Sequence, residues 1–178
     1  SPSSSCVPPS SSSSRRVSAS AFLSAAIKVA VNPRSCEGLA GVDQERILKA
    51  TLKDLYNGVP MEEVRKCVVL AARTLIEKDP AYSFVTARLL LDALRHEALG
   101  EEATQHDMAT KYAEYFPRFV QHGAKIGLLN EALLQYDMKA LGAALKPERD
   151  LQFGYLGLQT LYDRYFLVDQ HAVHANAG

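Results

Sequence analysis

The chain of 178 residues has few cysteines, and the three that it contains are far apart. Cys6, Cys36 and Cys67 form no C-x-x-C pair, so the ligand spacing of a structural zinc site is absent. An odd number at this spacing also excludes the disulfide framework of a small secreted domain. The sequence contains neither a G-x-x-x-x-G-K-[ST] phosphate loop nor a G-x-G-x-x-G turn, so these nucleotide-binding motifs are missing as well.

An excess of charge of one sign and a long apolar run are also absent. Twenty basic residues balance twenty acidic ones, whereas a surface for nucleic acid or anionic lipid needs a basic excess. No stretch approaches the ~18 consecutive apolar residues of a membrane span. We therefore expect no nucleic-acid partner and no membrane partner. Apolar residues make up 47% of the chain, and the length suits one medium domain or two small ones.

The balanced total charge hides a division of the chain. Residues 1–36 contain thirteen serines and four basic residues but no acid, whereas the rest carries twenty acids and sixteen bases. This composition predicts a Ser-rich disordered tail over residues 1–35. Two origins stay open for the tail: an organelle transit peptide, or a stretch unrelated to the protein. We expect a cytoplasmic protein in the second case and an organelle protein in the first. Because the chain begins with Ser1 rather than Met, we expect it to be incomplete or processed at that end.

From Asp43 onward the apolar residues recur at helical spacing. Asp43 is a suitable N-cap for a first helix, and Asn57-Gly58 is a suitable end for it. Pro60 is typical of a first helical position and predicts the start of a second helix. Asp79-Pro80 predicts the start of a third helix, which runs to Gly100. Short connections between these helices favour antiparallel packing.

The second half of the chain continues the same pattern. Helices are predicted over residues 104–120, 130–136 and 151–165, and Gly123 is expected to break the first of them. The last helix carries an apolar stripe from Leu151 to Tyr165, with intervals of four and three residues. No alternating strand pattern of convincing length appears. The sequence therefore predicts an all-α fold, a helical bundle preceded by a disordered N-terminal tail.

No group of residues in the sequence makes a self-contained active site. A nucleophile needs a base beside it, and most serines lie in the predicted tail. Cys67 lies at the edge of an apolar stripe and is interpreted as a buried structural thiol. His171 and His174 have the spacing of one helix face but no acid or cysteine beside them. His106-Asp107 is interpreted as a solvated helix start rather than an acid–base pair.

Three stretches of the sequence together resemble one protein family. They are CEGLAGVDQERILKATLKDLYNGVP (residues 36–60), ARTLIEKDPAYSFVTARLLLDALRHEALG (residues 72–100) and LGAALKPERDLQFGYLGLQTLYDRYFLV (residues 141–168). They are similar to the N-terminal part of the large (alpha) subunit of class I ribonucleoside-diphosphate reductase, in its bacterial branch. The similarity is most specific in LKPERDLQFGYLGLQTLYDRYF and runs through most of residues 36–168.

The resemblance implies a division of the chain. Residues 36–100 correspond to partial helices of an ATP-cone regulatory domain, residues 101–168 to the helical segment before the catalytic barrel, and residues 169–178 to a tail. In this family the large subunit reduces ribonucleoside diphosphates to deoxyribonucleoside diphosphates for DNA synthesis, by a thiyl-radical mechanism. The cysteines of that chemistry lie in the barrel, beyond the matched region. We therefore assign no catalytic residue and no metal ligand to this chain, and we expect no activity from it alone.

The resemblance also implies partners and effectors. In the family a small (beta) subunit generates the radical, and a reductant of the thioredoxin or glutaredoxin type supplies electrons. Large subunits form homodimers, and ATP and dATP act as allosteric effectors of the cone. No cofactor is expected in this chain itself.

The nucleotide-contact positions of the family's cone correspond to Met61, Arg65 and His96. The family has a Thr, a His and a Lys there, and a β-hairpin with a Val-x-Lys-Arg stretch completes the site. Residues 1–35 contain no match to that hairpin, and Met61 has no hydroxyl. Arg65 keeps a charged donor suited to phosphate. We therefore expect a degenerate cone. A non-catalytic helical regulatory or interaction module stays open as the alternative, with the Leu151–Tyr165 stripe exposed for a partner.

Overall fold

The computed structural model describes residues 33–56 and 59–166, and every regular element in these residues is a helix. In chain order the elements are η1 (Pro33–Cys36), α2 (Gln44–Asp54), α3 (Met61–Thr74), α4 (Tyr82–Leu99), α5 (Met108–Lys125), η2 (Glu131–Gln135), α6 (Met138–Ala143), η3 (Pro147–Gln152) and α7 (Tyr155–Arg164). The absence of strands from this part confirms the predicted all-α fold. No helix in it is long and apolar enough to cross a membrane.

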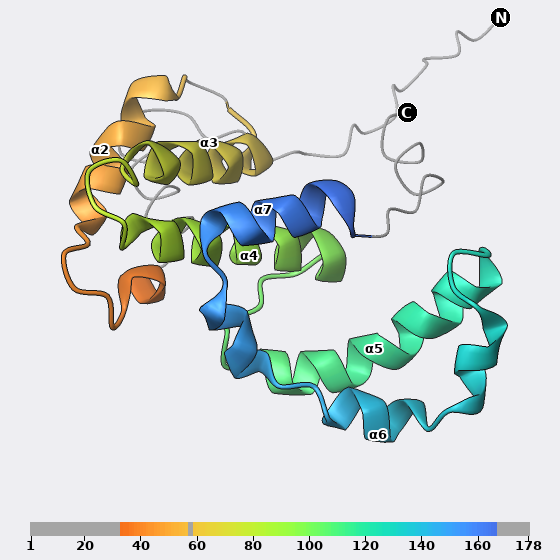
Figure 1. The fold of residues 1–178 in the computed structure, drawn as a ribbon. Helices are drawn as coiled ribbons and strands as arrows, with labels where there is room; N and C mark the ends of the chain where they lie inside the picture. Colours follow the sequence, from red (N-terminus) through yellow and green to blue (C-terminus); the bar gives the residue numbers. More distant parts are fainter. Residues whose placement is uncertain (1–32, 57–58, 167–178) are drawn as a thin grey trace, which may run out of the picture.

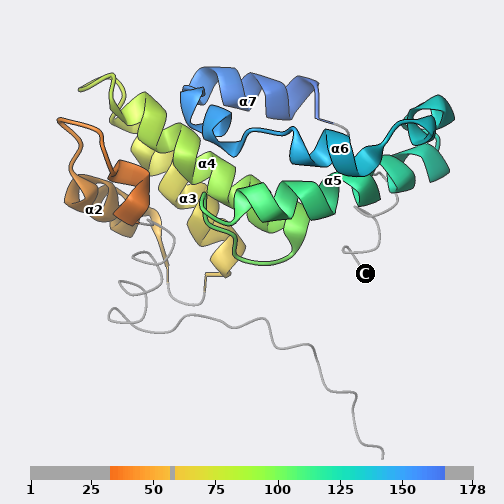
Figure 2. The same ribbon diagram turned by 90° about the horizontal axis from the view of Figure 1, so that it is seen from below.

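The helices form a packed group with an arm. Helices α2, α3, α4 and α7 make up the group: α2 packs on α3, and α4 packs on both α3 and α7 (Figure 1). Helix α5 leads away from the group, and α6 returns along it, so that these two form the arm. The view from below shows the same arm extending beyond one end of α4 (Figure 2). η3 then carries the chain back to the start of α7.

The core lies inside the packed group and takes side chains from all four helices. Ile47 of α2, Val64 and Val68 of α3, Val85 of α4 and Leu158 of α7 are each at most 2% exposed. Val64 and Val68 are four residues apart and therefore lie on one face of α3. The apolar periodicity of the sequence thus marks the buried faces correctly in these helices.

The predicted capping residues lie at the starts of α2 and α4, although α4 begins slightly later than predicted. The carboxylate of Asp43 accepts a hydrogen bond from the backbone N–H of Glu45 at 2.8 Å, which caps α2. The N–H of Asp43 donates to the hydroxyl of Tyr82 at 3.0 Å. Asp79 accepts from the N–H of Ala81 at 2.8 Å, and α4 itself begins at Tyr82. Because Tyr82 is only 1% exposed, its bond to Asp43 ties the start of α2 to the start of α4.

The prediction that Gly123 breaks the fourth predicted helix is wrong. Helix α5 continues to Lys125, and the chain turns at Gly127, whose φ of 75° is a conformation that glycine adopts without strain. At Gly123 the missing side chain serves packing, since a Cβ there would lie 2.7 Å from Cδ1 of Leu129. The glycine therefore lets the chain fold back closely against the end of α5.

Helix α6 was not predicted from the sequence. Asp137 caps it by accepting hydrogen bonds from the N–H groups of Lys139 and Ala140, each at 3.0 Å. Gly142 faces α5, where a Cβ would lie 3.3 Å from Cα of Ala113. This small residue permits a close approach of the backbones of α5 and α6 in the arm.

The folded body begins earlier than the tail prediction allows. Pro33–Cys36 forms η1, and Nη1 of Arg88 donates to the carbonyls of Ser35 at 3.1 Å and Glu37 at 2.8 Å. These bonds anchor η1 to α4, so the prediction of disorder is wrong for residues 33–35. Residues 1–32, with the transit-peptide interpretation, lie outside the described residues, and so does the predicted tail over residues 169–178.

The predicted stripe from Leu151 to Tyr165 is only partly buried. Tyr155 and Leu158 are 8% and 2% exposed, whereas Leu151 and Tyr165 are 37% and 69% exposed. The buried pair faces α4, where the N–H of Tyr155 donates to Oγ of Ser83 at 3.2 Å. Helix α7 therefore buries its N-terminal half against the group, whereas Leu151, which lies in η3 rather than in α7, and Tyr165 leave both ends of the predicted stripe open.

Candidate functional site

The predicted nucleotide-contact positions are divided between the core and a polar surface. Met61 is the first residue of α3 and packs, half-buried, against the hydrophobic core. Arg65 lies one turn further along α3, and His96 lies in the last turn of α4. Glu102, in the loop after α4, brings the last two together: it forms an ion pair with Arg65, and its Oε1 is 3.8 Å from Nδ1 of His96.

The pairing with Glu102 limits what Arg65 can bind. The side chain of Arg65 is only 14% exposed, and a carboxylate already occupies one of its terminal nitrogens. A phosphate arriving there would meet the negative charge of Glu102 beside the guanidinium. The described contacts thus bring Arg65 and His96 together around an acid, while Met61 contributes an apolar side chain to the core.

A second polar cluster, centred on Arg95, was missed by the sequence analysis. Arg95 is 7% exposed, and its Nη2 donates to Oδ2 of Asp150 at 3.0 Å. The hydroxyl of Tyr112 donates to the same carboxylate oxygen at 2.6 Å. Gln105 accepts from Arg95, and its own amide donates to the carbonyl of Pro147 at 2.6 Å. The cluster therefore joins α4, α5 and η3 at the point where the arm meets the packed group.

Burial and the Asp150 carboxylate act together on Tyr112. Desolvation raises the pKa of its hydroxyl, the hydrogen bond to Asp150 adds to this effect, and the pKa reaches about 12. Tyr112 therefore stays protonated and donates to Asp150 at any physiological pH. With Arg95 on its other side, Asp150 has a charged and a neutral donor, as a buried carboxylate needs.

Asp92 is the carboxylate of this region whose charge is least favoured by its surroundings. It lies one turn before Arg95 on α4, with Oδ1 at 3.5 Å from Nη1 of Arg95. Burial raises its pKa from 3.8 to about 6, and the attraction of Arg95 offsets only part of that rise. A carboxyl with a raised folded-state pKa favours folding in its protonated form, so ionised Asp92 weakens the fold at neutral pH.

We predict that Asp92→Asn stabilises the protein above pH 6. The protonated carboxyl of Asp92 contributes its full share to the free energy of unfolding below about pH 4, and this share is lost as the pH rises to about 6. The shift corresponds to about 2–3 kcal/mol at pH 7. Urea unfolding of the wild type and the variant at pH 4 and pH 7 measures the difference. A variant that is less stable than the wild type at pH 7 would show that the pair with Arg95 outweighs the burial of the charge.

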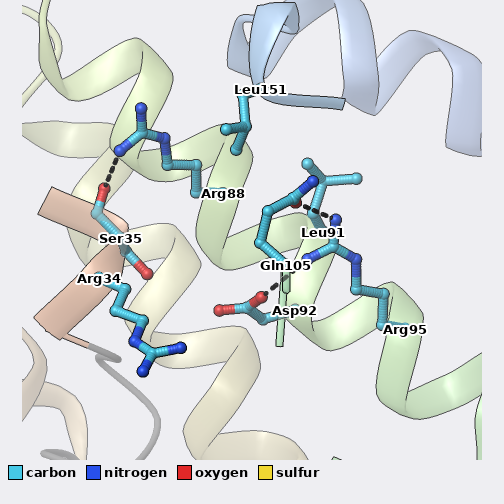
Figure 3. Close-up of a pocket in the computed structure, with 8 residues that line it drawn as sticks. All are labelled: Arg34, Ser35, Arg88, Leu91, Asp92, Arg95, Gln105 and Leu151. Carbon is cyan, nitrogen blue, oxygen red and sulfur yellow. Dashed lines mark hydrogen bonds and ion pairs between the residues drawn. The ribbon is translucent and has the colours of Figure 1, made fainter. Parts of the chain in front are cut away.

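A shallow pocket opens beside the Arg95 cluster. It has a cavity volume of only about 40 Å³, is open to solvent, and is lined by Arg34, Ser35, Arg88, Leu91, Asp92, Arg95, Gln105 and Leu151. Figure 3 shows Arg88 and Arg95 reaching toward it from α4, with Ser35 opposite them on η1. Arginine therefore dominates the polar lining of this pocket.

The described cysteines do not form reactive sites. Cys36 and Cys67 are free thiols, and burial raises the pKa of each above its usual value. A raised pKa leaves less thiolate, which is the nucleophilic form. Cys67 is only partly buried, so it is more exposed than the interpretation as a buried structural thiol predicts, although its raised pKa agrees with an unreactive thiol. In residues 33–56 and 59–166 no three His, Cys, Asp or Glu side chains are grouped to hold a metal ion.

Comparison with curated proteins shows the relationship of this chain. It is 42% identical over 113 residues to the ribonucleoside-diphosphate reductase subunit alpha of Chlamydia trachomatis, a match that covers 64% of this chain and 11% of that protein. The subunit alpha of Helicobacter pylori is 34% identical over 134 residues, or 75% of this chain and 16% of that protein. The corresponding Escherichia coli subunit is 25% identical over 134 residues. No family model matches the chain.

Each of these relatives is an oxidoreductase by its name, a reductase of ribonucleoside diphosphates. The matched region of this chain is similar to part of these ribonucleoside-diphosphate reductase alpha subunits. The chain spans only 11–17% of the length of the relatives described here.

Proposed function

We propose that this chain is a helical segment of the large subunit of a class I ribonucleoside-diphosphate reductase. The single observation that carries the proposal is the identity of 34–42% to subunit alpha proteins over 64–75% of the chain. We assign residues 36–100 to a partial ATP cone and residues 101–168 to the helical segment that precedes the catalytic barrel. In this proposal the radical chemistry on ribonucleoside diphosphates takes place in the barrel, and these helices support it.

The free thiols of the described region fit a supporting role. Radical reduction of a ribose needs a cysteine that forms a thiyl radical and a further pair that supplies electrons. Cys36 and Cys67 are instead separate thiols on η1 and α3, each with a raised pKa. We therefore propose that neither takes part in catalysis.

An activity assay tests the proposal that the chain does not catalyse the reduction by itself. The 178-residue chain, mixed with a reductase beta subunit, a ribonucleoside diphosphate and a dithiol reductant, is expected to form no deoxyribonucleoside diphosphate. A complete alpha subunit from a bacterial relative serves as the positive control in the same mixture. Product formation by the chain alone, abolished by Cys36→Ser or Cys67→Ser, would contradict the proposal.

The proposal also assigns partners. The word "alpha" in the relatives' names supports a second type of subunit, and we propose a small beta subunit that generates the radical. A thioredoxin- or glutaredoxin-type reductant and a second large subunit complete the proposed assembly. By the same resemblance we propose a cytoplasmic location.

We further propose that the cone positions Met61, Arg65 and His96 have lost the allosteric binding of ATP and dATP. The ion pair of Arg65 with Glu102 and the packing of Met61 against the core support this. The prediction is that Arg65→Gln leaves the affinity for ATP and dATP unchanged, as measured by calorimetric titration of both proteins. A tenfold or greater loss of affinity in the variant, about 1.4 kcal/mol, would show that Arg65 holds a nucleotide.

A further inference from the structure

The arm formed by α5 and α6 lies outside the hydrophobic core of the packed group. Among the described residues, the members of the core cluster come from the chain before residue 95 and from α7, and none comes from residues 108–143. Met108 and Val120 of α5 are buried but do not belong to that cluster. In both views the arm leads away from the group (Figures 1 and 2), and η3 contacts both α4 and α5. The place where the arm meets the group therefore decides how firmly the arm is attached.

A polar junction attaches the arm at that place. It consists of Arg95 on α4, Gln105 in the following loop, Tyr112 on α5 and Asp150 on η3. Arg95 donates to Gln105 and, at 3.0 Å, to Asp150. Tyr112 donates to the same carboxylate at 2.6 Å. The bonds of this junction therefore depend on one buried cation, Arg95.

Asp92 shares that cation with Asp150. Its Oδ1 lies 3.5 Å from Nη1 of Arg95, so two carboxylates face one guanidinium and repel each other when both are ionised. Gln105 and Leu151 line the same small pocket as Asp92 (Figure 3). Since these two residues belong to the loop and to η3, movement of the arm away from α4 lets water reach Asp92. Hydration favours an ionised carboxylate, so ionisation of Asp92 and detachment of the arm favour each other.

The other elements packed around Asp92 also carry charged groups. Burial is the largest cause of the raised pKa of Asp92; Arg95 and Arg65 lower this pKa, Glu102 raises it, and the result is about 6. The further charged or titratable groups around it are Arg34 of η1, Arg88 of α4, His96 of α4 beside Glu102, and Asp150 and Tyr112 across Arg95. The arginines stay charged at every accessible pH, whereas Asp92 changes its charge close to neutral pH.

We propose that the arm is a hinged element whose attachment is controlled by the protonation of Asp92. Protonated Asp92 leaves Arg95 to Asp150 and keeps the arm attached, whereas ionised Asp92 repels Asp150 and favours the detached arm. The proton's contribution to attachment is complete below about pH 4 and is lost as the pH rises through about 6. With a pKa of 3.8 for hydrated Asp92, the equilibrium constant for detachment rises about tenfold between pH 5 and pH 7.5. This switch does not depend on the assignment of the chain to a reductase subunit.

Amide hydrogen exchange of the 178-residue chain at pH 5 and pH 7.5 tests this switch, with rates corrected for intrinsic exchange at each pH. The backbone N–H groups of Asp107 and Phe153 report on the junction. They donate to the carbonyls of Thr104 and Asp150, in turns too short to persist once they leave α4. Their protection factors are expected to fall about tenfold from pH 5 to pH 7.5. At pH 7.5 they are expected to be at least about tenfold less protected than the N–H of Val68 in α3, because the arm detaches without unfolding of the group.

Asp92→Asn separates the effect of Asp92 from that of the histidines, which as a residue type also titrate between pH 5 and pH 8. The amide has nearly the size of the carboxyl but no charge, so the junction of this variant is expected to be equally protected at both pH values. The matched control is Asp163→Asn, since Asp163 lies on the exposed side of α7 and accepts one hydrogen bond, from Gln159. It is expected to keep the pH response of the wild type.

Several results would overturn the switch. Equal protection of Phe153 and Val68 at pH 7.5 would show that the arm leaves the group only when the whole protein unfolds. Equal protection of Phe153 and Val120 would show that the arm unfolds instead of detaching as a folded unit. A wild-type junction that is equally protected at both pH values would remove the pH dependence. A response that persists in Asp92→Asn would assign it to groups other than Asp92.

Discussion

Asp150→Ala is expected to lower the free energy of unfolding by about 3–5 kcal/mol. The variant leaves Arg95 buried with its main counter-charge removed, and it also removes the acceptor of the Tyr112 hydroxyl. Loss of one partner from a buried ion pair costs more than the pair itself contributes, because the remaining charge stays out of water. The effect is large here because Asp150 connects η3 to both α4 and α5.

Chemical denaturation at pH 7 measures this loss, with Asp163→Ala as the control. Asp163 lies on the exposed side of α7 and accepts one hydrogen bond, from Gln159, so its replacement is expected to change stability by less than about 0.5 kcal/mol. The double variant Arg95→Met/Asp150→Leu is expected to recover much of the lost stability, since it leaves no unpaired charge. A single Asp150→Ala variant as stable as the control would show that the Arg95 cluster does not hold the arm.

Leu158→Ala is the second large effect, with an expected loss of about 2–5 kcal/mol. Leu158 is 2% exposed and belongs to the core cluster that α7 forms with α3 and α4. Its truncation leaves a cavity that neighbouring helices can fill only in part. Since Tyr155 is the only other buried residue of α7, the loss is also expected to loosen the attachment of α7 to the packed group.

Leu156→Ala provides the matched control on the same helix. Leu156 is 76% exposed, so the same chemical change there is expected to be nearly neutral. Tyr162 is only half-buried, with its hydroxyl donating to Glu97 at 3.2 Å, and Tyr162→Ala is expected to cost less than Leu158→Ala. Unfolding midpoints in urea for the three variants rank their losses of stability. Equal losses for Leu156→Ala and Leu158→Ala would contradict the burial pattern of α7.

Local signals were enough to predict most helices. Asp43 marked the start of α2 because its side chain can cap a helix, and the four-residue spacing of Val64 and Val68 marked the buried face of α3. The role of Gly123 was predicted wrongly because glycine can end a helix but can also allow a neighbouring side chain to pack closely against the helix. Only the contact with Leu129 distinguishes the two roles. Helix α6 is too short for its periodicity to be visible in the sequence.

The polar clusters could not be predicted in the same way. Arg95 and Asp150 are 55 residues apart in the chain, and nothing in the local pattern pairs them. The one available signal was an arginine within the mostly apolar stretch before Gly100, where a buried charge requires a partner. For Arg65 and His96 the resemblance gave the positions, but only the fold places Glu102 between them. The role of these positions toward nucleotides stays a prediction.

The central claim, that this chain is a segment of a reductase large subunit, is tested most directly by its coding sequence. The transcript should be read from upstream of Ser1 to well past Gly178. The account predicts an open frame that continues into further polypeptide similar to the remaining length of the bacterial alpha subunits, with the cysteines of the catalytic barrel. A stop codon directly after Gly178 would contradict the account and leave a helical protein without that chemistry.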